Sequence, residues 1–415
     1  MLLRHITEHV KDQNWCPLSR RNGLLSLVVS AVLICSACTI LDTDKNADVS
    51  YITSPTPLRI VSANDGNALS GSWNARSNLP DSITIIDLSP DAPPITRTAS
   101  GTVPNTFSGD PKSAIVESGR YAFIPNHNWG AVEEAISQVT VVDLESPTLD
   151  VVETISLPPF CWQSLAHPDG QRALIICGDQ FFIYRMEAGK PVRLSESAPF
   201  HRDFLSFDID PQGRTIIATA AEELSFSAEI ELHLFSVEGD VITHTAKVGI
   251  DPSVGGIDQP FAPRFSPDGS RVLVPNGLGL AIKPPLDAIL NIDMTATPPR
   301  ITQAIPDMAQ GLESLAFHPS GRFAVVTCID GPYISHLAVI DLTSPSMRVL
   351  YYLPVEFVPQ GIEFSPDGSM LFVQSTTANH INVFKVDGFR LNKSPYVLRT
   401  GEGPASMALT LRAQK

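Results

Sequence analysis

The side chains that could carry out chemistry are scattered along this sequence and form few recognisable site motifs. The acidic residues show no calcium-loop spacing. A Cys-x-x-Cys motif occurs at Cys35 to Cys38, without the following histidine that a haem site needs. The sequence has no Gly-x-Ser-x-Gly nucleophile elbow and no glycine-rich phosphate loop. These spacings predict no cofactor and no metal, so any site must be assembled by the fold from distant segments.

Composition and charge limit the class of protein and its partners. The chain is 43% hydrophobic and 18% charged, as in folded proteins, with 35 prolines and 26 glycines between short apolar runs. That pattern favours a β-rich fold with many turns. The formal net charge of −15 argues against nucleic-acid binding and against electrostatic docking on anionic lipid.

A turn motif recurs about every 50 residues and predicts a repeat fold. Proline fixes the first corner of such a turn, aspartate caps it, and glycine takes the position of positive φ. An alternating apolar run precedes each turn and another follows it, which is the pattern of a β-hairpin. The six copies are Glu117-Ser118-Gly119-Arg120, His167-Pro168-Asp169-Gly170, Asp210-Pro211-Gln212-Gly213, Ser266-Pro267-Asp268-Gly269, His318-Pro319-Ser320-Gly321 and Ser365-Pro366-Asp367-Gly368.

A third apolar run follows each hairpin, and it occurs seven times. The copies begin at Ile83, Val139, Phe181, Ile230, Ile289, Leu337 and Ile381. A weaker fourth run follows most of them. Four antiparallel strands per unit are a propeller blade, so we predict an all-β, seven-bladed β-propeller over residues 58–411. Residues 58–100 lack a first strand and residues 403–409 supply one, so the C-terminal strand should complete the N-terminal blade.

Several second strands resemble the YVTN-type repeat of bacterial propellers. The resemblance is clearest at Val61-Ser62-Ala63-Asn64, Phe123-Ile124-Pro125-Asn126, Leu273-Val274-Pro275-Asn276 and Val325-Val326-Thr327-Cys328. It covers about residues 58–411 and implies kinship with lactonase-like propellers and with the β-subunit-like propellers of quinoprotein amine dehydrogenases. The catalytic signature of neither group can be placed on this sequence, so the resemblance implies a fold and no activity.

In a propeller, the loops into strand one and between strands two and three share the face around the central channel. Mixed charges, amides and histidines converging there form the default binding site. The alternative is a structural duty, in which each residue only holds water or caps a strand end. The candidate ligand-binding residues are Asn126, His127, Trp162, Asp203, Arg264, Asn276, Glu313, His336, Gln360 and His380.

The cysteines after residue 38 predict one disulfide. Pairing Ala166 with Arg172 across the His167–Gly170 turn would place Cys161 directly opposite Cys177. Opposite positions of a hairpin can meet disulfide geometry, and an exported domain lies in an oxidising compartment. We therefore predict a Cys161–Cys177 disulfide with Cys328 as a buried free thiol, and two free buried cysteines as the alternative.

The N-terminal segment has the pattern of an export signal. Four basic residues precede an apolar run of about 11 residues from Leu24 to Ile34, too short to span a bilayer as a helix. The following Cys35-Ser36-Ala37-Cys38 resembles a bacterial lipobox, although Cys35 replaces the usual aliphatic residue. We predict a lipoprotein-type signal peptide at residues 1–37, lipidation of Cys38 and a flexible tether at residues 38–57. A non-lipidated signal peptide or an uncleaved anchor is the alternative.

Two functions are compatible with these features. The first is a monomeric binding or scaffold propeller in the cell envelope, an outer-membrane lipoprotein attached by its lipid alone and presenting its funnel to an envelope protein or a small ligand. The second is a lactone hydrolase, with a histidine or carboxylate of the funnel as general base and Arg264 stabilising an oxyanion.

Overall fold

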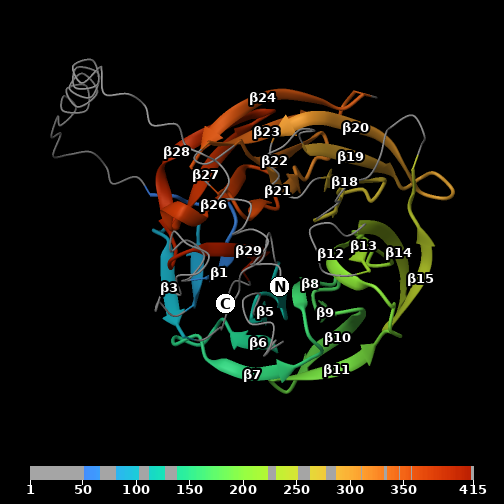
Figure 1. Cartoon of the computed structure of the whole chain (residues 1–415). Coiled ribbons are helices and arrows are strands. Elements are labelled where there is room, and N and C mark those ends of the chain that lie inside the picture. The colour runs from blue at the N-terminus through green and yellow to red at the C-terminus, as the bar shows by residue number, and fades with distance from the viewer. Residues whose placement is uncertain are drawn as a thin grey trace, which may run out of the picture. The chain divides into compact units, whose positions relative to one another are not determined.

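The computed structural model describes residues 51–65, 81–101, 112–126, 138–222, 230–250, 262–276, 287–309, 311–330, 334–344, 346–356 and 358–412. These residues all belong to the unit Tyr51–Lys415. They form seven sheets, each built on four antiparallel strands and arranged in a ring (Figure 1). The prediction of an all-β, seven-bladed propeller is confirmed. The described residues contain no helix with the length and hydropathy needed to cross a membrane.

Each blade has four strands that follow one another from the axis of the ring to its outside. The innermost strands are β29 (Pro404–Leu411), β4 (Ala114–Val116), β8 (Cys161–Ala166), β12 (Asp203–Ile209), β17 (Arg264–Phe265), β21 (Gly311–Phe317) and β25 (Ile362–Phe364), for blades 1 to 7 in that order. The second strands are β1 (Leu58–Asn64), β5 (Tyr121–Asn126), β9 (Arg172–Cys177), β13 (Thr215–Ala221), β18 (Arg271–Asn276), β22 (Phe323–Ile329) and β26 (Met370–Ser375).

The third and fourth strands complete each blade toward the outside of the ring. The third strands are β2 (Ser82–Leu88), β6 (Gln138–Asp143), β10 (Gln180–Glu187), β14 (Ile230–Glu238), β19 (Asp287–Asp293), β23 (Ser335–Asp341) and β27 (His380–Asp387). The outermost strands are β3 (Ile95–Ser100), β7 (Val151–Ser156), β11 (Lys190–Glu196), β15 (Val241–Lys247), β20 (Arg300–Ala309), β24 (Arg348–Val355) and β28 (Arg390–Arg399). A short strand β16 (Gly249–Ile250) pairs in parallel with β20, and a 3₁₀ turn η1 (Thr376–Ala378) follows β26.

Burial explains why these apolar runs form strands. Second strands such as β5 and β26 are buried along their whole length, because both of their faces pack against neighbouring blades. Outermost strands such as β7 and β15 are exposed at most positions, because their outer edge faces solvent. Each apolar cluster joins residues from adjacent blades, for example Phe181 of β10 with Phe204 and Phe207 of β12. The core is therefore a set of layers between blades.

The N- and C-terminal parts of the propeller close the ring in blade 1. Strand β29 pairs antiparallel with β1, from Leu58↔Leu411 to Asn64↔Pro404, so the last strand completes the first blade as predicted. Ile52 lies in the segment that the sequence assigns to the tether, yet it is buried among side chains of blades 1 and 7. Cys38 and the predicted signal peptide lie outside the described residues.

The predicted turns close the hairpins of strands one and two. In the turn of blade 3, the Gly170 amide donates to the carbonyl of His167 at 2.8 Å, and Gly170 has a φ of +69°. The turn glycines of blades 4 to 7 repeat this hydrogen bond at 2.8–2.9 Å with φ between +69° and +73°. Glycine is needed at these positions because its missing side chain allows the left-handed backbone.

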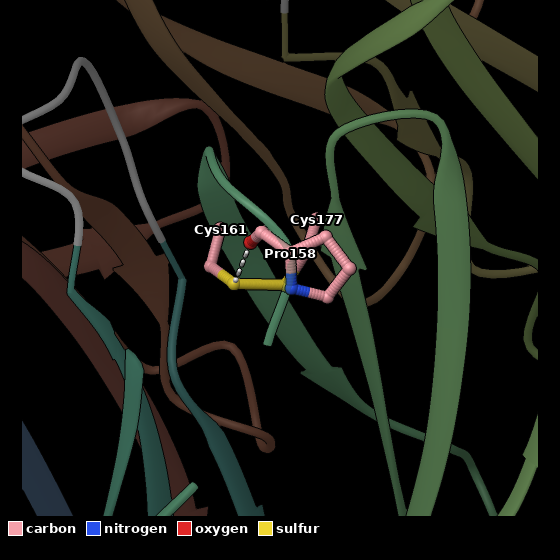
Figure 2. Close-up of a disulfide and its surroundings, with 3 residues drawn as sticks. All are labelled: Pro158, Cys161 and Cys177. Atoms are coloured by element: carbon pink, nitrogen blue, oxygen red, sulfur yellow. Dashed lines mark hydrogen bonds between the residues drawn. A yellow bond between two sulfur atoms is a disulfide. The ribbon is translucent and has the colours of Figure 1, made fainter. Parts of the chain in front are cut away.

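The structure joins Cys161 and Cys177 by a disulfide between β8 and β9, and Cys328 is a buried free cysteine. Figure 2 shows the bond at the start of β8, where Cys161 Sγ also lies 3.6 Å from the carbonyl oxygen of Pro158. The hairpin register differs by one residue from the prediction. Ala166 pairs with Ala173 rather than with Arg172, and a bulge between Cys161 and Gln163 restores the opposition of the two cysteines.

Candidate functional site

The innermost strands bring one residue from each blade to an equivalent position around the ring. In blades 2 to 7, this residue lies five positions before the turn glycine, and the register to the second strand identifies its counterpart in blade 1. We call these residues the axial ring. Four are small or apolar and three are charged. The ring consists of Ala408, Ala114, Leu165, Asp208, Arg264, Ala316 and Glu363.

A lysine joins the charged members of this ring across the axis. Lys112 lies two residues before Ala114, in the segment that leads into β4. The Lys112 ammonium forms an ion pair with Glu363, although blades 2 and 7 are separated by blade 1. The Lys112 charge also acts on Asp208 in blade 4. Side chains from blades that are not neighbours can meet only at the centre, so the pair of Lys112 and Glu363 lies near the axis. Because Lys112 and Arg264 both act electrostatically on Asp208, we call Lys112, Asp208, Arg264 and Glu363 the axial cluster.

Asp208 is the carboxylate that blade 4 contributes to the axial cluster, and it is partly buried. Its Oδ2 accepts a hydrogen bond from the Phe265 amide at 2.7 Å, which joins blade 4 to blade 5. Burial raises the pKa of Asp208, and the nearby charges of Arg264 and Lys112 only partly oppose this effect. A carboxylate with a raised pKa can accept a proton nearer to neutral pH than an exposed one.

The two cations of the axial cluster differ in how they are held. Arg264 is 5% exposed, and its Nη1 donates to the carbonyl of Pro263 at 2.8 Å. Lys112 and Glu363 keep 13% and 24% of their side chains exposed, so a ligand entering the channel can reach this pair. The axial cluster offers fixed positive charge beside a proton acceptor, which is the chemistry needed to stabilise and to create an oxyanion.

The axial cluster lies below the face on which the sequence places its candidates. That face is formed by the ends of the second strands, and the axial ring pairs with residues three positions earlier. Three residues of strand correspond to a depth of about 10 Å. A small molecule entering from this face would therefore pass the predicted candidates before it reached the charges.

Several predicted site residues make hydrogen bonds or contacts within the fold. Asn126 is 2% exposed, and its Nδ2 donates to Thr140 Oγ1 of the adjacent strand at 2.7 Å. Gln360 is buried, and its Oε1 accepts from Thr376 Oγ1 at 3.2 Å. Trp162 is buried, and its ring stacks on Phe160. These contacts agree with the structural alternative, in which such residues cap strand ends.

Other predicted residues lie on separate blades around the same face. His336 is the second residue of β23 in blade 6, and its Nδ1 lies 3.5 Å from Asp330. Burial lowers the pKa of His336. His380 is partly buried, with Nδ1 3.0 Å from the carbonyl of Ala378 in blade 7. Burial raises the pKa of Asp203 in blade 4, and the charge of Asp179 adds to that shift.

Three predicted residues remain to be placed. Asn276 is 8% exposed at the end of β18, and Glu313 is partly exposed in β21. His127 lies outside the described residues.

Arg264 is the predicted residue that belongs to the axial cluster, whereas Lys112, Asp208 and Glu363 were missed. A signal for two of them is present in the sequence. Asp208 and Glu363 interrupt apolar runs, between Phe207 and Ile209 and between Ile362 and Phe364. Each lies five residues before its turn glycine, as Arg264 does, so aligning the repeats on their glycines would have brought the three charges together.

Comparison with known proteins gives similarity of structure only. No protein-family model matches the sequence, and no curated protein is similar to it in sequence. A candidate 6-phosphogluconolactonase from Bacteroides fragilis matches with a TM-score of 0.63 and 13% identity over 87% of this chain and 100% of its own. A similar candidate from Bacteroides uniformis gives a TM-score of 0.62 and 15% identity over 86% and 100%. The periplasmic gluconolactonase PpgL of Pseudomonas aeruginosa gives 0.59 and 14% over 86% and 99%. At these identities the likeness establishes the propeller fold.

Proposed function

We propose that the chain is a lactone hydrolase whose site is the axial cluster at the bottom of the propeller funnel. The observation that carries this proposal is the convergence of Lys112, Asp208, Arg264 and Glu363 from four blades. Further support comes from the solved propellers of similar fold, which include two 6-phosphogluconolactonase candidates and a gluconolactonase. This is the second of the two functions that the sequence allows.

The proposed reaction uses the cluster as a base beside fixed cations. Asp208 accepts a proton from water, and the water oxygen forms a bond to the lactone carbonyl carbon. The negative charge that develops on the carbonyl oxygen is stabilised by Arg264 and Lys112. The bond from this carbon to the ring oxygen then breaks, and the protonated Asp208 returns its proton to the leaving oxygen, so the product is a hydroxy acid. Glu363 orients Lys112 through their ion pair.

The test is to incubate the full chain with a panel of lactones that includes glucono-δ-lactone and 6-phosphogluconolactone. Proton release measures the rate of hydrolysis. We expect Arg264→Gln to lower kcat/KM by about 10²- to 10³-fold, as for loss of an oxyanion donor. Asp208→Asn should lower kcat by about 10²-fold or more. Arg185→Gln is the matched control, because Arg185 is exposed and pairs with Glu187 on the outside of blade 3. The proposal would be refuted if the full chain hydrolysed none of these lactones faster than the spontaneous rate.

A binding or scaffold role is the second candidate, and one contact favours it. The ion pair of Lys112 with Glu363 satisfies two of the four charges without any ligand. Under this alternative the full chain would bind an envelope protein or a sugar acid without turnover. Isothermal titration with gluconate separates the two functions: binding that depends on Arg264, with no hydrolysis of the corresponding lactone, supports the binding role.

We also propose that the protein is anchored in the cell envelope through lipid on Cys38. The proposal is supported by the lipobox-like sequence and by the Cys161–Cys177 disulfide, which suits an oxidising compartment. Labelling of bacteria with a palmitate analogue tests it. Incorporation should be lost in Cys38→Ala and retained in Cys35→Ala, and labelling of the Cys38→Ala chain would contradict it.

A further inference from the structure

Two histidines meet on the outer half of blade 4, away from the axial cluster. His233 lies on β14 and His244 on the outermost strand β15. His233 Nδ1 and His244 Nε2 face each other at 3.2 Å. His233 is 5% exposed, whereas His244 is exposed to solvent, so this nitrogen pair lies at the surface with one buried partner.

A β-bulge creates this meeting. Leu234 pairs with Ala246 but Phe235 pairs with His244, so one extra residue, Thr245, is inserted in β15. Without the bulge, strand alternation would point the His244 side chain to the face of the sheet opposite His233. Phe200 closes one side of the pair, with ring centroids 4.8 Å and 5.0 Å from those of the two imidazoles.

A carboxylate fixes the tautomer of the buried histidine. His233 Nε2 lies 3.1 Å from Glu231 Oε2, so Nε2 carries the proton and donates it to the carboxylate. Nδ1 is then left with a lone pair aimed at His244. Lys247 and Arg202 are the cations at this site, and both contact the Glu231 carboxylate.

We propose that His233 Nδ1 and His244 Nε2 form a two-histidine site for a late first-row divalent metal ion, Cu²⁺ most strongly, with water completing the coordination and Glu231 orienting His233. Two nitrogens 3.2 Å apart, each about 2.0–2.1 Å from a metal, subtend an angle of about 100–105°. That angle suits neighbouring ligands in tetragonal or tetrahedral coordination. Imidazole is a ligand for Cu²⁺, Ni²⁺ and Zn²⁺, with Cu²⁺ the tightest binder.

The arrangement of Glu231 is that of a second coordination sphere. Metal-binding histidines usually donate their other ring N–H to a carboxylate, which holds the ring and raises its basicity. His244 needs only to change tautomer, so that its proton moves from Nε2 to Nδ1. There the N–H can donate a hydrogen bond to solvent. Among the described residues no group of three or more ligating side chains is gathered, so the protein supplies two ligands here and the affinity should be moderate.

The experiment is a Cu²⁺ titration of the metal-free full chain by calorimetry, with electron paramagnetic resonance of the copper-loaded protein. We expect His244→Gln to bind one equivalent of Cu²⁺ fewer than the wild type. His380→Gln is the matched control, a histidine on blade 7 that should leave the stoichiometry unchanged. Glu231→Gln should retain the site with affinity lowered about 10- to 100-fold.

The outcomes separate this site from copper bound elsewhere on the chain. The resonance spectrum should show coupling to two imidazole nitrogens in the wild type and in His380→Gln. Equal copper stoichiometry in His244→Gln and wild type would overturn the proposal, as would a spectrum without imidazole nitrogen coupling. His244 is exposed on an outermost strand, and an unchanged melting temperature of His244→Gln would verify that the variant is folded.

Discussion

At the scale of the residue, hydrogen bonds decide which form of a partly buried group is stable. His318 begins the turn of blade 6, and its Nδ1 accepts from the Ser320 amide at 3.1 Å. Nε2 therefore carries the proton and donates to the carbonyl of Gly368 in the next blade at 3.1 Å. The ring also stacks on Phe323. A second proton would have to replace the Ser320 bond in an apolar setting, so the neutral form is the one that the fold stabilises.

This environment gives the stability of the propeller a dependence on pH. Burial lowers the pKa of His318 in the folded state below its unfolded value of about 6.5. Its contribution to stability is therefore fully present above pH 6.5 and is lost as pH falls through the folded-state pKa. We expect the melting temperature to fall between pH 7 and pH 5, with a smaller fall in His318→Gln. An unchanged slope in the variant would show that this group does not contribute.

The three cysteines of the described residues should differ in their reactivity. Cys328 is fully buried, and burial raises the pKa of its thiol, so little thiolate is present to react. We expect native alkylation to leave Cys328 unmodified, and non-reducing peptide mapping to find Cys161 linked to Cys177. Denaturation without reductant should make Cys328 the one residue of the three that reacts. Alkylation of Cys161 or Cys177 in the unreduced protein would contradict the disulfide.

At the scale of the element, the turns that close each hairpin also join neighbouring blades. The Nε2 of His167 lies 3.0 Å from the carbonyl of Gly213, the turn glycine of the next blade. His318 and Gly368 repeat this contact between blades 6 and 7. The His-Pro turns are therefore a contact between blades as well as a hairpin connection, which their sequence alone does not reveal.

Alanine at the turn glycines measures this contact. A Cβ on Gly213 would lie 2.3 Å from His167 Nε2, whereas a Cβ on Gly170 would meet nothing within 4 Å. Both glycines have positive φ, near +70°, so both variants bear the backbone cost. We expect Gly213→Ala to be less stable than Gly170→Ala by about 1–3 kcal/mol, the usual cost of overpacking. Urea denaturation measures the difference. Adding His167→Ala should cost less in Gly213→Ala than in the wild type, and strict additivity would contradict this explanation.

The sequence predicts local features of these elements well and contacts between elements poorly. Turns such as His167–Gly170 are predictable because proline, aspartate and glycine act within four residues. The register after that turn was wrong by one residue, because the bulge between Cys161 and Gln163 has no sequence signal. Within the axial cluster, Asp208 and Glu363 carry a signal in the aligned repeats, whereas Lys112 has none, because its ion pair with Glu363 joins blades far apart in the chain. Such a pair depends on the closed ring rather than on local pattern.

At the scale of the whole molecule, one buried arginine links the closing blade to the blade beside it. Arg59 of β1 is 1% exposed, and its Nε and Nη2 donate to the two oxygens of Asp87 at 2.7 Å and 3.0 Å. Its Nη1 donates to the Gly119 carbonyl and to Glu145, both in blade 2. Arg412, directly after the closing strand, lies 3.4 Å from Asp87. One carboxylate thus stabilises the end of the chain, the closing blade and its neighbour.

Neutralising that carboxylate should weaken the ring more than neutralising its equivalent in the next blade. Asp143 of β6 is opposite Tyr121 as Asp87 of β2 is opposite Arg59, but Asp143 pairs with the exposed Arg120 at 3.1 Å. We expect Asp87→Asn to cost about 3–5 kcal/mol, because it leaves a buried guanidinium short of its main partner. Asp143→Asn should cost less than about 1 kcal/mol, as for surface ion pairs. Urea denaturation, monitored by tryptophan fluorescence, measures the free energy of unfolding of both variants under the same conditions. Equal costs would mean that closure rests on the pairing of β1 with β29, and that the buried charge contributes little.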